Sequence, residues 1–156
     1  GDWSSDVCSS DLVGMVAGPE DAVATVVPLL DPVCATVVRC GDVPQATQMK
    51  LAVNLFLITQ VGGLVEAYHF AEHLGLDLER FRAVLDAGPM ASVVSRGKLA
   101  KLAEGDLGAQ ASVRDVFYNN RLIAEAARAG HVSTPLLDAC HRLFEEAERQ
   151  IGRAHV

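Results

Sequence analysis

Two short apolar runs near the start of the chain predict a small β-α-β unit. Residues 13–17 (VGMVA) are apolar and end at Gly18-Pro19, which is typical of a strand followed by a turn. Pro19 suits the first position of a helix, and the apolar positions after it stop near Asp31-Pro32. Residues 35–39 (ATVVR) are rich in β-branched side chains and are closed by Gly41, so they predict a second strand.

From Gln45 onward the spacing of apolar positions is helical. Helices are expected over residues 45–74, 78–87, 91–103, 112–129 and 135–150, with glycines at or near most of the breaks between them. The sequence contains no internal repeat with a period of about 20–50 residues. The pattern therefore predicts a mainly α-helical domain that follows the end of an α/β domain.

The first of these helices contains the longest apolar stretch, residues 49–67. Its length is close to what a bilayer requires, but polar residues and a glycine pair interrupt it. Charged and amide side chains are costly in hydrocarbon, so the stretch favours a helix buried in a globular core or in a dimer. The interrupting residues are Lys50, Asn54, Gln60, Gly62-Gly63 and Glu66.

Composition and charge indicate a single folded domain and argue against some classes of partner. The chain has 156 residues, half of them hydrophobic, which is enough for one domain with a core. Its 13 Lys and Arg against 20 Asp and Glu give a net charge of −7, which argues against nucleic acid or an anionic membrane as a partner. The four cysteines have no paired spacing and no signal peptide is evident, so we expect free thiols and a cytoplasmic protein.

The two ends of the sequence differ in kind from the rest. Residues 2–12 (DWSSDVCSSDL) and residues 151–156 (IGRAHV) match in-frame translations of a common sequencing adapter. A match at both ends is hard to obtain by chance, so residues 1–12 and 151–156 are expected to be adapter-like and to take no part in the fold. Residues 13–150 are then expected to be a piece of a longer protein.

A lysine and an asparagine stand one helical turn apart at the start of the long helix. Lys50 and Asn54 are four residues apart, so they share one helix face, and the positions around them are apolar. Burial and a neighbouring positive charge favour the neutral form of a lysine. Such a lysine can exchange a proton with a carbinol oxygen while the amide orients the substrate. The structural alternative is a lysine that reaches solvent at the helix start beside a capping asparagine.

Further motifs follow in order along the chain. After the segment 41–48 come Lys50-Leu51-Ala52-Val53-Asn54, Val65-Glu66-Ala67 and Gly75-Leu76-Asp77, and later Arg114-Asp115 and a Gly-x-x-x-x-Pro motif at residues 130–135. The order and spacing of these motifs resemble the β-hydroxyacid dehydrogenases, the family of 3-hydroxyisobutyrate dehydrogenase. The resemblance extends over residues 13–150.

The resemblance implies a fold and a domain organisation. The fold would be the helical C-terminal domain of a 6-phosphogluconate-dehydrogenase-like protein, preceded by a βαβ remnant of a Rossmann domain. Residues 13–40 would end a truncated dinucleotide-binding domain, and residues 41–150 would form an all-helical catalytic and dimerisation domain. The complete enzyme would act on a small β-hydroxy acid with NAD or NADP, and it would be a homo-oligomer through the long helix.

The resemblance also implies roles for individual residues. Lys50 would be the catalytic proton-transfer residue, Asn54 and Asp115 would bind the substrate, and Arg114 would bind the cofactor. The Gly-x-Gly-x-x-Gly turn that binds a pyrophosphate is absent from the sequence, so the main cofactor site is expected upstream and this chain alone is expected to be inactive. Departures from the family pattern are Pro44 and Ala46 for glycines, Val53 for Asn, Leu107 for Phe and Arg114 for Lys.

Other interpretations stay open. Residues 69–73 (HFAEH) have the H-x-x-E-H spacing of a class of zinc peptidases, although no third ligand stands out downstream and no metal is expected. Residues 66–69 contain one Glu-x-x-His, whereas di-iron bundles need two. An imine reductase-like enzyme is a closer alternative, against which Lys50 itself favours alcohol chemistry. The remaining alternative is a non-catalytic helical oligomerisation module.

Overall fold

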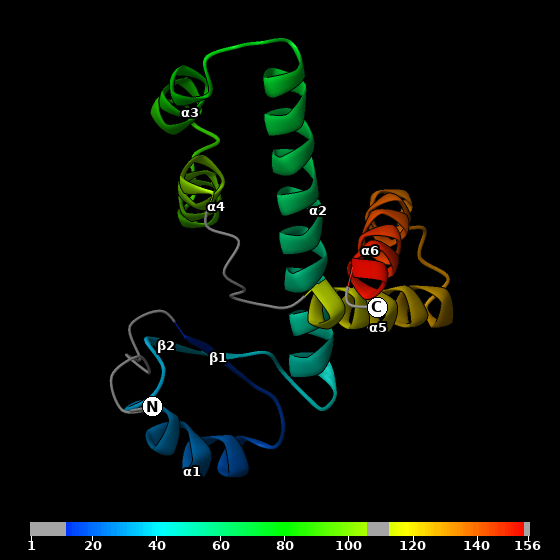
Figure 1. The fold of residues 1–156 in the computed structure, drawn as a ribbon. Coiled ribbons are helices and arrows are strands. Elements are labelled where there is room, and N and C mark those ends of the chain that lie inside the picture. Colours follow the sequence, from blue (N-terminus) through cyan, green and yellow to red (C-terminus); the bar gives the residue numbers. More distant parts are fainter. Residues whose placement is uncertain (1–11, 106–112, 155–156) are drawn as a thin grey trace. The chain divides into compact units, whose positions relative to one another are not determined.

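The computed structural model describes residues 12–105 and 113–154 (Figure 1). Most of the adapter-like residues lie outside these ranges, although the last helix continues four residues past Gln150 to Ala154. The chain divides into two compact units, Gly1–Val53 and Asn54–Val156. This division falls inside the long helix, and the predicted domain boundary at residues 40 and 41 stays a prediction.

The first unit contains the predicted β-α-β element. It consists of β1 (Val13–Val16), α1 (Glu20–Leu30) and β2 (Thr36–Arg39). The two strands are parallel, with Val13 opposite Thr36 and Val16 opposite Arg39. A parallel pair requires a crossover connection, which α1 provides.

Gly41 has a structural reason to be glycine. Its φ of 104° is rarely accessible to L-residues, and a Cβ atom there would collide with Oε1 of Gln45. The same Oε1 accepts a hydrogen bond of 3.0 Å from the backbone N–H of Asp42. Gly41 and Gln45 together therefore form the turn from which the long helix starts.

The long helix and its end agree with the sequence prediction. α2 (Gln45–His73) lies within one residue of the expected range 45–74. Gly75 ends it in the left-handed region with a φ of 69°, and the N–H of Leu76 donates to the carbonyl of Ala71 at 3.0 Å. This is the hydrogen bonding by which a glycine closes a helix C-terminus.

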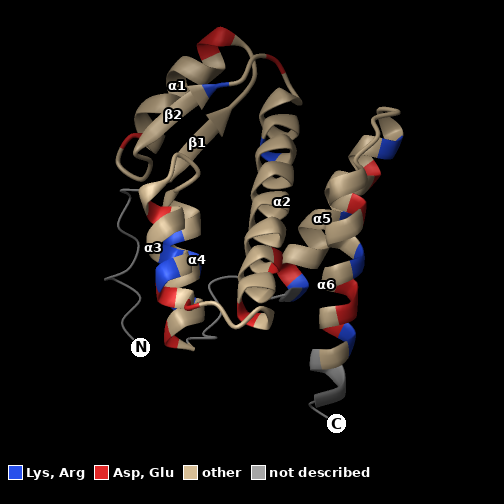
Figure 2. Ribbon diagram, turned by 90° about the horizontal axis from the view of Figure 1, so that it is seen from above, with Lys and Arg blue, Asp and Glu red and all other residues tan. Residues whose placement is uncertain are grey.

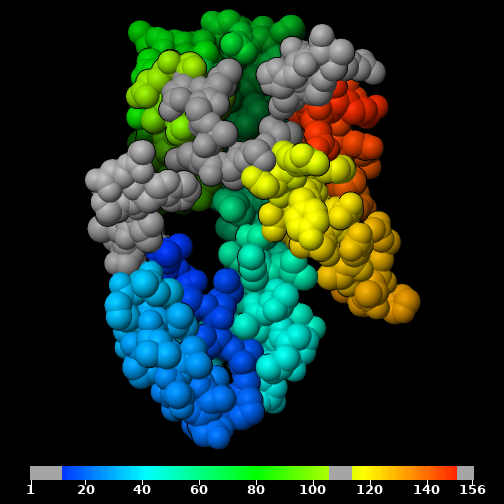
Figure 3. Space-filling view, turned by 60° about the horizontal axis from the view of Figure 1, so that its bottom comes forward, coloured from blue at the N-terminus to red at the C-terminus, as the bar shows by residue number. Residues whose placement is uncertain are grey.

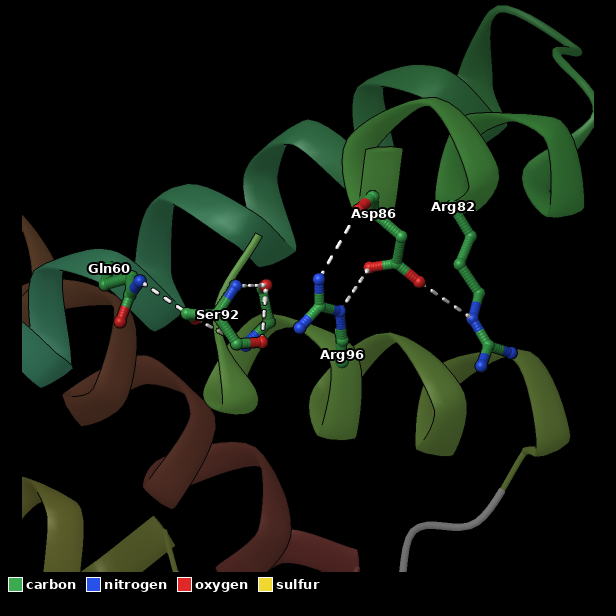
Figure 4. Close-up of polar contacts among 6 residues, drawn as sticks. Gln60, Arg82, Asp86, Ser92 and Arg96 are labelled. Atoms are coloured by element: carbon green, nitrogen blue, oxygen red, sulfur yellow. Dashed lines mark hydrogen bonds and ion pairs between the residues drawn. The ribbon is translucent and has the colours of Figure 1, made fainter. Parts of the chain in front are cut away.

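α3 (Leu78–Ala87) and α4 (Val93–Glu104) form a pair tied together by charged side chains. The carboxylate of Asp86 lies 3.7 Å from Nε of Arg82 and 3.9 Å from Nε of Arg96 (Figure 4). Ser92 caps α4, and Nε2 of Gln60 donates to its Oγ at 3.3 Å. This last bond connects α2 to the start of α4.

α5 (Val113–Ala129) and α6 (Pro135–Ala154) complete the second unit. They pack against one another and form one continuous surface in Figure 3. Within this unit, α3 and α4 lie on one side of α2, and α5 and α6 lie on the other (Figures 1 and 2). The buried apolar side chains come from several helices and include Leu64, Leu99, Ile123 and Leu137.

Most of α2 is exposed. All of its residues are described, and the buried ones are Ile58, Leu64 and Ala71. Figure 2 shows few charged residues along α2, whereas α3, α4 and α6 carry charges of both signs. By length and composition alone α2 could cross a membrane. The sequence left two alternatives open for this helix, burial in a globular core or burial in a dimer. The structure shows that this chain does not bury α2 in a core of its own.

Candidate functional site at the α2–α5 contact

Lys50 and Asn54 lie one turn apart on α2, as the sequence predicts. The helix is continuous through both residues. Lys50 is exposed, whereas Asn54 is half-buried. The described residues of this chain therefore do not supply the burial that the sequence argument invoked for Lys50.

A hydrogen bond joins Asn54 to α5. Its Nδ2 donates to Oδ1 of Asn119 at 3.4 Å, across 65 positions of sequence. Asn119 is itself anchored, because its Nδ2 donates to the backbone carbonyl of Asp115 at 2.8 Å. Two side-chain amides thus connect α2 to the first half of α5.

Arg114 and Asp115 lie in the first turn of α5, and both are exposed. Asp115 is one turn before Asn119 and accepts the hydrogen bond from its side chain. Within the second unit, the structure therefore brings the helix that contains Arg114 and Asp115 to Asn54.

A buried polar cluster that was not predicted from the sequence lies beside this contact. Asn120 is fully buried, and its Oδ1 lies 3.0 Å from Nδ1 of His141 on α6. The His141 ring stacks on Phe117 with centroids 4.9 Å apart. Among the described residues, Nδ2 of Asn120 has no hydrogen-bond partner. Two adjacent asparagines in a helix with a strong apolar face were the available signal, because asparagine is a poor helix former.

The turn between β1 and α1 does not fit a dinucleotide pyrophosphate. Pro19 has no N–H to donate at the start of α1, and Glu20 and Asp21 place two carboxylates in the first turn. A phosphate-binding helix start needs free N–H groups and no opposing negative charge. Arg39 lies 3.3 Å from Glu20 and offsets only part of that charge.

The zinc interpretation finds little support in the part of the chain that the structure describes. His69 and His73 have ring centroids 6.1 Å apart, and Nδ1 of His69 is 3.7 Å from Oε2 of Glu72. No group of three or more His, Cys, Asp or Glu side chains that could hold a metal occurs among the described residues.

Comparison with known proteins decides the family. Residues 45–155 match the family described as "NAD-binding of NADP-dependent 3-hydroxyisobutyrate dehydrogenase". The chain belongs to this family. The match confirms the resemblance found from the order of the motifs, and the family's description confirms the expectation of a nicotinamide cofactor at the family level.

A curated relative agrees with this assignment. It is a probable mitochondrial 3-hydroxyisobutyrate dehydrogenase of Arabidopsis thaliana, 24% identical over 146 residues, and the match covers 86% of this chain and 41% of that protein. The chain thus spans less than half the length of this relative.

Solved structures show the same fold. A 3-hydroxyisobutyrate dehydrogenase of Salmonella typhimurium has a TM-score of 0.80 at 24% identity, over 86% of this chain and 47% of that one. The enzyme of Mycobacterium tuberculosis, described with L-serine, has a TM-score of 0.80 at 20% identity, over 90% and 50%. Psf3 in complex with NADP+ and 2-OPP also has a TM-score of 0.80, at 21% identity over 92% and 50%. The mainly α-helical fold class is thereby confirmed.

Proposed function

We propose that the complete enzyme containing this chain is an NAD(P)-dependent oxidoreductase that oxidises a small β-hydroxy acid of the 3-hydroxyisobutyrate type. The observation that carries the proposal is the family match over residues 45–155, which includes Lys50, Asn54, Arg114 and Asp115. The contact between α2 and the start of α5 supports a common site for Asn54 and α5.

In this proposal Lys50 is the proton-transfer group. As the C–H bond of the carbinol breaks, hydride leaves that carbon and the O–H proton passes to Nζ of a neutral Lys50, so that a carbonyl forms. The bound cofactor supplies the hydride acceptor.

The other site residues bind and orient. Asn54 holds the substrate beside Lys50, and Asp115 contacts it from the start of α5. Arg114, an exposed cation in the first turn of that helix, binds the cofactor. The β1–α1 turn does not fit a pyrophosphate, so the main cofactor site belongs to residues outside this chain. The chain alone is therefore inactive.

We also propose that the enzyme is a homo-oligomer through α2. Large apolar side chains along this helix are exposed in the chain by itself, and such patches mark interfaces. An apolar groove of about 670 Å³ runs between α2 and α6 and adds to this surface. The exposed side chains of α2 are Met49, Val53, Phe56, Leu57, Val65 and Phe70.

The test of the proposed function is steady-state kinetics on the complete enzyme with 3-hydroxyisobutyrate and either NAD+ or NADP+. Lys50→Met is expected to lower kcat by about 10²- to 10⁴-fold, the usual contribution of a general acid–base group. Cofactor binding, followed by fluorescence titration, should survive the substitution because the pyrophosphate site lies elsewhere.

Three results would contradict the proposal. Full activity of Lys50→Met would remove the assigned role of Lys50. Turnover of cyclic imines with no turnover of hydroxy acids would favour the imine reductase-like alternative, and the absence of any oxidoreductase activity would favour a non-catalytic oligomerisation module.

A further inference from the structure

We propose that Asn119 is a positioning residue that fixes the Asn54 amide, so that Asn54 keeps its carbonyl oxygen for a hydrogen-bond donor in the substrate site. The inference rests on the proposed function and adds to it a residue and a hydrogen-bond polarity. It is carried by two hydrogen bonds, Asn54 to Asn119 and Asn119 to Asp115.

The orientation of the Asn119 amide follows from its anchor. The backbone carbonyl of Asp115 can only accept a hydrogen bond, so the atom of Asn119 that approaches it at 2.8 Å must be the donor, Nδ2. The remaining polar atom of that side chain, Oδ1, is the one that lies 3.4 Å from Asn54. Asn119 therefore presents an acceptor to α2.

The orientation of Asn54 follows in turn. An acceptor on Asn119 requires a donor on Asn54, so Nδ2 of Asn54 occupies the contact. Oδ1 of Asn54 is the end of the amide that does not make this contact. The helix backbone of α5 thus determines, through two amides, which end of Asn54 is held and which oxygen remains available.

This polarity selects among the groups of a hydroxy acid. A carbonyl oxygen accepts from a hydroxyl, which is a donor, and it repels a carboxylate, which only accepts. Asn54 is therefore suited to a hydrogen-bond donor of the site rather than to the acid group of the substrate. Without the Asn119 contact, the Asn54 amide could rotate by about 180° and present its NH2 group to the carboxylate instead.

The matched control is Gln60. Its Nε2 donates to Oγ of Ser92 at 3.3 Å, so it is another α2 amide that bonds to a different helix over nearly the same distance. It lies six positions after Asn54 and has no role in the proposed site. Gln60→Ala removes one interhelical hydrogen bond of α2 and leaves Asn54 and Asn119 intact.

The test is a double-mutant cycle in the complete enzyme. Asn119→Ala is expected to lower kcat/KM for the hydroxy acid by about 2- to 13-fold, the worth of one net hydrogen bond. In an Asn54→Ala background the same change should have almost no further effect, because Asn119 acts only through Asn54. Gln60→Ala should have the same small effect in both backgrounds. An Asn119→Ala loss that is equal in both backgrounds would show a merely structural role and overturn the inference.

A second readout does not depend on activity. In enzyme labelled with ¹⁵N-asparagine, the side-chain NH2 signals of Asn54 are identified by their disappearance in Asn54→Ala. They should shift in Asn119→Ala and stay in place in Gln60→Ala. Unchanged Asn54 signals in Asn119→Ala would overturn the positioning role whatever the substrate is. The expected shift in an enzyme that does not turn over hydroxy acids would support the positioning and contradict the proposed function alone.

Discussion

Two adjacent glycines of α2 have opposite surroundings, and this allows a sharp prediction about how α2 packs on α6. A Cβ atom at Gly62 would lie 3.0 Å from Sγ of Cys140, whereas a Cβ at Gly63 would meet nothing within 4 Å. Cys140 is buried, and its Sγ also lies 3.9 Å from the carbonyl of Ile58. Substitution by alanine therefore tests the same helix with and without a close neighbour.

The expected magnitudes follow from two opposing effects. Replacing a glycine in a helix interior by alanine stabilises by about 1 kcal/mol, and this applies to both positions. Gly63→Ala should gain this amount. Gly62→Ala should also incur an overpacking cost of about 1–3 kcal/mol, because a carbon–sulfur contact of 3.0 Å forces Cys140 or α6 to shift. The two variants should therefore differ by about 1–3 kcal/mol in the free energy of unfolding.

The assay is urea unfolding followed by far-ultraviolet circular dichroism. Adding Cys140→Ala to Gly62→Ala should recover most of the overpacking cost, since the new methyl group then occupies the space left by the sulfur. Equal stabilisation by Gly62→Ala and Gly63→Ala would refute the close approach of α2 and α6. A destabilising Gly63→Ala would mean that the space beside Gly63 is filled by another chain.

Three further outcomes are expected. Asp77→Ala should lower the free energy of unfolding by about 1 kcal/mol in the same assay, because the Asp77 carboxylate caps α3 by accepting from the N–H of Arg80 at 3.1 Å. The control, Glu79→Ala in an exposed position of the same helix, should change the free energy of unfolding little. Burial raises the pKa of the Cys140 thiol above its ordinary value of 9.0, so as the pH rises the unfolded chain loses this proton before the folded chain does. The free energy of unfolding should therefore fall as the pH rises above 9.0, and it should fall less in Cys140→Ala. Light scattering of the complete enzyme should show an oligomer that Phe56→Glu weakens, and a monomeric wild type would contradict the interface through α2.

The ends of the helices were predictable because local signals determine them. Asp77 caps α3, and Gly75 closes α2 in a conformation that other residues rarely adopt. The expected ranges for α2 and α3 accordingly agree with the structure to within one residue. The exposure of α2 was not predictable, because apolar periodicity indicates that a face is to be covered but not which chain covers it.

In the candidate site, too, contacts within one helix were predictable from the sequence and contacts between helices were not. Lys50 and Asn54 could be placed on one helix face from their spacing alone, since four residues make about one turn. Neither spacing nor periodicity could show that Asn119 bonds to Asn54, which is 65 positions away. The order of motifs in the family pointed to Arg114 and Asp115 on α5. The contact that joins α5 to α2 is made one turn later, by Asn119.

Adjacent asparagines on α5 explain why one helix can serve two neighbours. Successive side chains of a helix point about 100° apart, so Asn119 and Asn120 contact different helices. Asn119 bonds to Asn54 on α2, and Asn120 lies 3.0 Å from His141 on α6. A fully buried asparagine whose Nδ2 finds no hydrogen-bond partner among the residues that the structure describes is costly. Its contact with His141 connects α5 to α6, on a different side of α5 from the contact of Asn119 with Asn54. α5 is thus held from two sides, by Asn120 toward α6 and by Asn119 toward α2.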